Sequence, residues 1–167
     1  MLIDTHSHLY LDAFGEDRAE MIERAKQVGV EQVLLPAIDS SHHGELLELA
    51  SSSPGFFKLM MGVHPCSVKP ETWKRELEIA KNYLDHGEYC AVGEIGIDLH
   101  WDKSTFDIQR EAFKIQIEWA KEMQLPIVIH CRKAFGEIFE VLDEVNSPEL
   151  FGVFHCFTGN AEQAEHI

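Results

Sequence analysis

Histidines at the ends of apolar runs are the first residues in this sequence that could do chemistry. The run "MLIDTHSH" ends in His6 and His8, which are two residues apart. In an extended strand, side chains two residues apart point to the same face, so both imidazoles can bind one metal ion. The pattern also fits a polar strand end exposed to solvent, and the rest of the sequence must decide between these interpretations.

The same combination of an apolar run and a polar end recurs along the chain. His64 follows "KLMMGV", Glu94 and Asp98 lie in "AVGEIGID", His130 ends "PIVIH", and His155 ends "FGVFH". Imidazole nitrogens and carboxylate oxygens are common protein ligands of divalent ions. A set drawn from successive runs predicts a metal site, although each residue alone also fits a hydrogen-bonded structural role.

Six strand-like runs alternate with six helical patterns. The runs that predict strands are residues 1–6, 30–36, 56–65, 89–96, 126–130 and 151–157. The patterns that predict helices are residues 16–29, 40–53, 71–87, 105–124, 134–145 and 161–167. Continuous apolar strands between helices are typical of a parallel sheet covered on both faces.

Two α/β architectures fit this alternation, an open doubly wound sheet and a TIM-like (β/α)8 barrel. No glycine-rich phosphate loop follows the first strand, which disfavours the dinucleotide-binding form of the open sheet. We therefore expect a single domain over residues 1–167 with about six of the eight units of a barrel, incomplete at its C-terminus. Active sites of such barrels lie at the carboxyl-terminal ends of the strands, where the polar residues fall.

The charge balance limits the partners that the protein can take. The chain has 29 acidic and 14 basic residues, which gives a formal net charge of −15. Such a surface repels phosphates and argues against electrostatic coating of long nucleic acids. A phosphate substrate would need local positive charge, which bound divalent ions can supply.

Targeting and redox features predict a cytoplasmic protein. The chain has no apolar run long enough to cross a membrane, and its start lacks the features of a signal peptide. Its four cysteines are scattered without a CxxC pair, so we expect reduced thiols. The remaining histidines are expected in loops or on helix surfaces: His42, His43, His86, His100 and His166.

Five motifs, in order, closely resemble the TatD family of metal-dependent deoxyribonucleases, within the amidohydrolase superfamily: "IDTHSHL", "GVHP", "VGEIGID", "IVIHCR" and "HCFTG". The resemblance implies a TIM-like barrel that hydrolyses phosphodiester bonds of DNA, as an exonuclease, with a metal-bound hydroxide. It implies two divalent ions (Mg, Zn or Mn) and no organic cofactor. The implied metal ligands are His6, His8, Glu94, His130 and His155.

The resemblance also assigns residues beside the ligands. His64 and Arg132 are expected to contact substrate, and Asp98 is expected to orient a ligand histidine or to cap a loop. With Glu94, which is expected to bridge the metals, these residues form the expected catalytic set. The forked donors of Arg132 suit a phosphate oxygen.

The sequence departs from the family at two places. The family carries a further metal-binding aspartate after the last strand, and this chain ends before that strand, so low activity is expected unless the remainder is supplied. Lys133 stands where family members often have an acid, which is expected to alter a loop more than the chemistry.

The expected substrate is single-stranded DNA or strand ends, because a narrow site suits an acidic surface better than long duplex does. Two alternatives stay open. One is hydrolysis of a small amide, lactone or deaminase-type substrate, since related barrels share this metal chemistry. The other is a truncated, inactive metal-binding barrel protein. The oligomeric state does not follow from the sequence.

Overall fold

A computed structural model describes residues 2–167, which form one six-stranded parallel sheet in the order β1-β2-β3-β4-β5-β6. The strands are β1 (Leu2–Asp4), β2 (Val30–Pro36), β3 (Phe57–Met61), β4 (Ala91–Asp98), β5 (Ile127–Arg132) and β6 (Gly152–Phe154). The α-helices are α1 (Arg18–Gln27), α2 (His43–Ser52), α3 (Trp73–His86), α4 (Phe106–Met123), α5 (Phe135–Val145) and α6 (Ala161–His166). Short 3-10 helices span Asp12–Phe14, Ser40–His42 and Pro65–Ser67. The predicted alternation of parallel strands and helices is confirmed.

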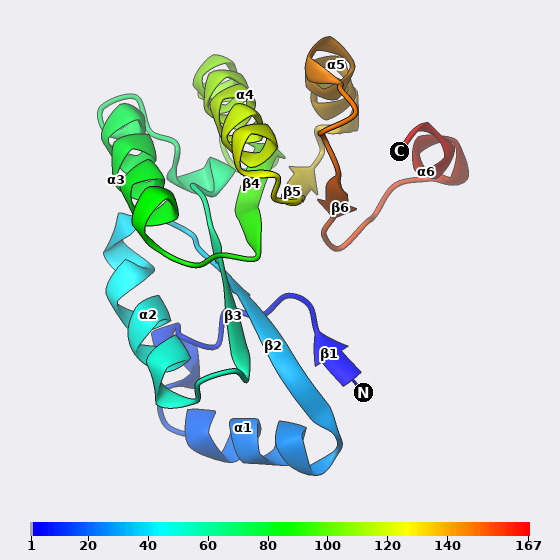
Figure 1. Cartoon of the computed structure of the whole chain (residues 1–167). Helices are drawn as coiled ribbons and strands as arrows, with labels where there is room; N and C mark the ends of the chain where they lie inside the picture. The colour runs from blue at the N-terminus through cyan, green and yellow to red at the C-terminus, as the bar shows by residue number, and fades with distance from the viewer. Residues whose placement is uncertain (1) are drawn as a thin grey trace.

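The sheet curls, and helices α1 to α5 lie around its outer side (Figure 1). Strands β1 and β6 are the two edges, and a gap between them is visible in the same view. Leu2 on β1 and Val153 on β6 expose more than half of their surface. Within residues 2–167, no helix combines the length and apolar character needed to cross a bilayer.

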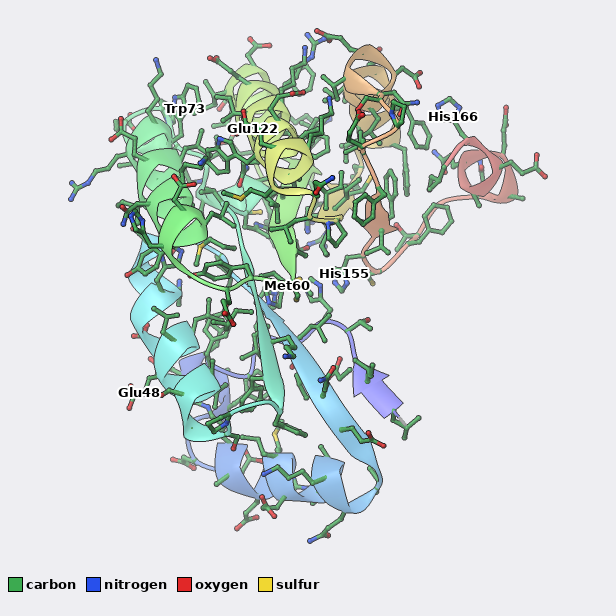
Figure 2. The ribbon with its side chains drawn as sticks, viewed as in Figure 1. Glu48, Met60, Trp73, Glu122, His155 and His166 are labelled. Atoms are coloured by element: carbon green, nitrogen blue, oxygen red, sulfur yellow. The ribbon has the colours of Figure 1, made fainter. Side chains whose placement is uncertain are left out.

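Apolar side chains pack on both faces of the sheet. The larger cluster lies between sheet and helices, where Ile95 and Ile97 of β4 belong to the same core as Phe113 and Ile117 of α4. A smaller cluster on the other face contains Met60, Ala91 and Val128 (Met60 is labelled in Figure 2). Strand β4 is buried at every position because it lies in the middle of the sheet.

Helix α4 connects the core with two loops near the strand ends. Its apolar stripe contains Phe113, Ile117 and Ala120, which are buried, and Phe106, which is only partly buried. Two amides share the buried side of the helix. The Oε1 atom of Gln109 accepts from the Asp98 N–H at 2.8 Å, and that of Gln116 accepts from the Val63 N–H at 2.7 Å. The apolar stripe alone did not indicate these two contacts.

The expectation that His43 lies on the surface is wrong. It is the first residue of α2, its exposed fraction is 2%, and its ring packs edge-on against Tyr83 of α3 at 4.8 Å between ring centroids. Neither ring nitrogen has a hydrogen-bond partner among the described residues. Burial lowers the pKa of His43 below its ordinary value of 6.5, although the charges of Glu76 and Asp39 oppose this shift.

Replacing His43 with leucine is expected to make the stability of the protein less sensitive to acid. Because the folded protein binds the His43 proton less readily than the unfolded chain, this residue costs stability as pH falls through about 6.5. The free energy of unfolding of the wild type should fall relative to the variant by up to about 1.4 kcal/mol per pH unit below that point. Urea unfolding of both proteins between pH 8 and pH 5 measures this difference. Parallel pH profiles would contradict it.

Candidate metal centre

The predicted ligands lie near the carboxyl-terminal ends of the strands, but not all within them. Because β1 ends at Asp4, His6 and His8 occupy the loop that follows it. Glu94 and His130 lie within β4 and β5. His155 directly follows β6, on the side of that strand that faces β1 (Figure 2). The two histidines of the opening motif therefore depend on a loop conformation and not on strand alternation.

Glu94 is the centre of the arrangement. Its Oε2 atom lies 3.0 Å from His6 Nε2 and 3.5 Å from His8 Nε2. Its Oε1 atom lies 2.9 Å from His130 Nδ1 and 3.8 Å from His64 Nε2. The two oxygens of one carboxylate thus face different pairs of imidazoles, which is the placement that a bridging ligand requires.

The imidazoles keep Glu94 ionised although it is buried. Burial alone would raise the pKa of this carboxyl, but the contacts with His130 and His6 outweigh burial and lower it far below its ordinary value. A permanent carboxylate surrounded by imidazoles offers a cation both charge compensation and lone pairs.

His6 provides the test of whether these residues fit a metal ion. Both of its ring nitrogens are buried and make no hydrogen bond within residues 2–167, although Nε2 lies 3.0 Å from Glu94 Oε2. Its ring stacks on that of His155 at 3.4 Å between centroids and an interplanar angle of 11°. Ligand atoms of His6, Glu94 and His155 all lie within 4.8 Å of one another. A divalent ion bound to these three residues would give one of the two His6 nitrogens a partner. The donor set therefore fits a divalent metal ion.

A second cluster of possible ligand atoms contains His64, Glu94 and His130. The backbone N–H of Cys66 donates to His64 Nδ1 at 3.1 Å, so Nδ1 must be the unprotonated nitrogen. Burial lowers the pKa of His64 to about 4, which leaves the neutral ring with its proton on Nε2. His64 therefore presents a donor to the site, which agrees better with the predicted substrate contact than with metal binding.

Asp98 holds the other side of His130. The Nε2 atom of His130 lies 2.8 Å from Asp98 Oδ2. The Oδ1 atom of Asp98 accepts from the backbone N–H groups of His100 at 2.8 Å and Trp101 at 3.2 Å. Burial disfavours charge on His130, but Glu94 and Asp98 outweigh burial and raise its pKa. This arrangement allows Asp98 both predicted functions, orientation of a histidine and capping of the following loop.

Arg132 ends β5, is exposed, and lies over an aromatic ring that sequence analysis did not single out. Its guanidinium carbon is 5.3 Å from the centroid of the Trp101 ring. Trp101 exposes 69% of its surface, which is unusual for tryptophan, and it follows Asp98 by three residues. The feature of the sequence that could have indicated a role for Trp101 is its position just beyond "GEIGID", in the loop that follows β4.

The family model described as "TatD related DNase" matches residues 3–167. A curated protein of Bacillus subtilis (strain 168), "Uncharacterized metal-dependent hydrolase YabD", is 39% identical over 98% of this chain and 64% of its own length. The "3'-5' ssDNA/RNA exonuclease TatD" of Rahnella sp. (strain Y9602) is 35% identical over 91% of this chain and 57% of its own length.

The crystal structure of YjjV, a TatD homolog from Escherichia coli K12, superposes with a TM-score of 0.84 at 30% identity. The match covers 99% of this chain and 63% of that one. This chain thus spans between 57% and 64% of the length of these three relatives. The likeness to a TatD homologue confirms the predicted TIM-like fold, of which residues 2–167 supply six strands. Because the family model matches nearly the whole chain, the chain belongs to the TatD family.

Proposed function

We propose that this protein is a metal-dependent hydrolase that cleaves phosphodiester bonds of DNA, acting on single strands from an end. The observation that carries the proposal is the placement of four imidazoles around the buried carboxylate of Glu94. Family membership and the printed name of the Rahnella relative favour a nucleic acid over a small amide as substrate.

In this proposal His6, His8, Glu94, His130 and His155 hold two divalent ions. The ions supply Lewis acidity toward water and neutralise phosphate charge. Glu94 stays ionised between the imidazoles and contributes one oxygen to each side of the site. Asp98 fixes the orientation of the His130 ring. Magnesium, zinc and manganese all fit a mixed nitrogen and oxygen donor set.

His64 and Arg132 are the proposed substrate contacts. Because the Nδ1 atom of His64 accepts from Cys66, its proton is on Nε2, which lies 3.1 Å from His130 Nδ1. In this proposal the Nε2–H group turns from His130 to a phosphate oxygen or the leaving oxygen when substrate binds. Arg132 offers forked donors to a second phosphate oxygen. The exposed ring of Trp101 beside it offers a stacking surface for an unpaired base. An aromatic ring next to an arginine that donates to phosphate favours single-stranded DNA over duplex DNA, because the bases of a duplex are already stacked on each other.

The test is hydrolysis of end-labelled single-stranded DNA by the purified chain in the presence of magnesium, manganese or zinc. We expect stepwise shortening from one end, and we expect EDTA to stop it. A panel of cyclic amides and lactones is assayed under the same conditions. Turnover of one of these with intact DNA would replace the nuclease proposal with the amidohydrolase alternative. Metal binding without any turnover would favour the inactive metal-binding alternative.

Replacing Arg132 with alanine is expected to raise KM for single-stranded DNA by about 10- to 100-fold, because a charge-assisted hydrogen bond to phosphate contributes about 1.5–3 kcal/mol. Steady-state kinetics on a labelled oligonucleotide measures this change. The control is Arg75→Ala on α3, which removes an exposed arginine at another element. An unchanged KM in Arg132→Ala, or an equal rise in both variants, would remove Arg132 from the substrate site.

A further inference from the structure

Tyr10 is a buried residue next to the predicted metal ligands, and it has no role in the proposed hydrolysis. Its exposed fraction is 0% although it follows His8 by only two residues in a loop. Its hydroxyl oxygen lies 2.8 Å from the carbonyl oxygen of Pro36, the last residue of β2. The same oxygen lies 2.9 Å from Nδ1 of His8.

The two contacts of this hydroxyl determine which nitrogen of His8 carries the proton. A carbonyl oxygen can only accept, so the single hydroxyl proton of Tyr10 is donated to Pro36. The hydroxyl oxygen must then accept from His8, which requires the proton of the neutral ring to be on Nδ1. The lone pair of His8 is therefore on Nε2, the nitrogen that lies 3.5 Å from Glu94 Oε2.

His64 shows the opposite arrangement at the same site. Its Nδ1 atom accepts from the N–H of Cys66, so its proton is on Nε2, which lies 3.1 Å from His130 Nδ1 and 3.8 Å from Glu94 Oε1. His8 and His64 thus present different groups to the same site, a lone pair in one case and a proton in the other. What separates them is the partner of Nδ1, which is Tyr10 in one case and a backbone N–H in the other.

We propose that Tyr10 is a positioning residue for metal binding, which holds His8 in the tautomer and orientation that give its Nε2 lone pair to the ion. Partners of this kind behind a ligand typically contribute 10- to 100-fold to metal affinity. The inference rests on the proposed metal site, but not on the nuclease activity.

The hydroxyl of Tyr10 can be removed without loss of the other contacts that hold the loop around Tyr10 in place. Arg18 donates from Nη2 to the backbone oxygens of Tyr10 and Leu11, each at 3.0 Å. The Tyr10 ring belongs to the main apolar core, and it also meets the His8 ring edge-on at 5.7 Å between centroids. Phenylalanine keeps these backbone and ring contacts, so Tyr10→Phe isolates the hydrogen bond.

The first measurement is the protonation of the histidine nitrogens in the metal-free protein near pH 8, read from long-range 1H–15N correlation spectra. In the wild type we expect the His8 proton on Nδ1 and the His64 proton on Nε2. In Tyr10→Phe the His8 signals should shift toward a mixture of tautomers, while those of His64 stay unchanged as an internal control. A wild-type His8 with its proton on Nε2 would overturn the proposal without any variant.

The second measurement is the affinity for manganese and zinc by calorimetric titration. We expect Tyr10→Phe to bind about 10- to 100-fold more weakly than the wild type. We expect Tyr89→Phe, which removes the hydroxyl of a partly buried tyrosine in the segment before β4, to bind like the wild type. Equal affinity in Tyr10→Phe and wild type would overturn the proposal, whatever the His8 tautomer does. If the wild type bound neither ion, the metal site itself would fail, and with it this inference, whereas loss of nuclease activity alone would leave it standing.

Discussion

Replacing Glu94 with glutamine is expected to lower the affinity of the protein for divalent ions by about 100-fold or more. Partners behind a ligand already contribute 10- to 100-fold, and Glu94 would itself bind the ions on both sides of the site. Glutamine keeps the shape of the side chain but loses the negative charge that four imidazoles surround. Calorimetric titration with manganese measures the effect, and circular dichroism shows whether the fold is retained.

Glu88→Gln provides the matched control for this change. Glu88 is exposed and precedes β4, so the same loss of charge occurs six residues away along the chain and outside the cluster. It should bind manganese as the wild type does. If Glu94→Gln bound manganese as tightly as Glu88→Gln, the metal centre would have to lie elsewhere.

Replacing Gly96 with alanine is expected to destabilise the protein by about 3 kcal/mol or more and to disturb the position of His130. Gly96 has a φ of +140°, which residues other than glycine rarely adopt. It pairs with His130 across β4 and β5. An added Cβ would lie 2.1 Å from the carbonyl oxygen of His130. Because that oxygen belongs to the backbone of a central strand, β5 itself would have to move.

Urea unfolding measures this loss, with Gly136→Ala as the control. Gly136 lies in α5, where an added Cβ would have no atom within 4 Å. Alanine there should change the free energy of unfolding by no more than about 1 kcal/mol, in the stabilising direction. A Gly96→Ala variant that unfolds at the same urea concentration as the wild type would show that β4 and β5 can separate without cost.

The order and type of the elements followed from patterns that are local in the sequence. The predicted strand at residues 30–36 coincides with β2, because an apolar run there begins directly after Gly29, which has the positive φ that ends a helix. The predicted final strand at residues 151–157 was too long, since β6 spans only Gly152–Phe154. At a sheet edge a strand has one partner, and the pairing with β5 stops at Phe154.

The grouping of the candidate ligands was also accessible from the sequence, because parallel strands bring their carboxyl ends together. Their role as ligands stays a prediction. The supporting contacts were not accessible, because they join residues far apart in the chain. Tyr10 bonds a backbone oxygen 26 residues away, and Gln116 bonds a peptide 53 residues away. His43 was misplaced for the same reason, since its burial depends on the packing of α2 against α3 and Tyr83.

The two glutamines of α4 restrict how this helix can change in evolution. Gln109 holds the peptide of Asp98, and Gln116 holds that of Val63, the neighbour of His64. Seven residues are about two turns, so both amides share one side of the helix. A single-residue insertion or deletion between them would rotate one amide by about 100° and release its loop. Insertions and deletions that keep both of these loops in place are therefore confined to the two ends of the helix.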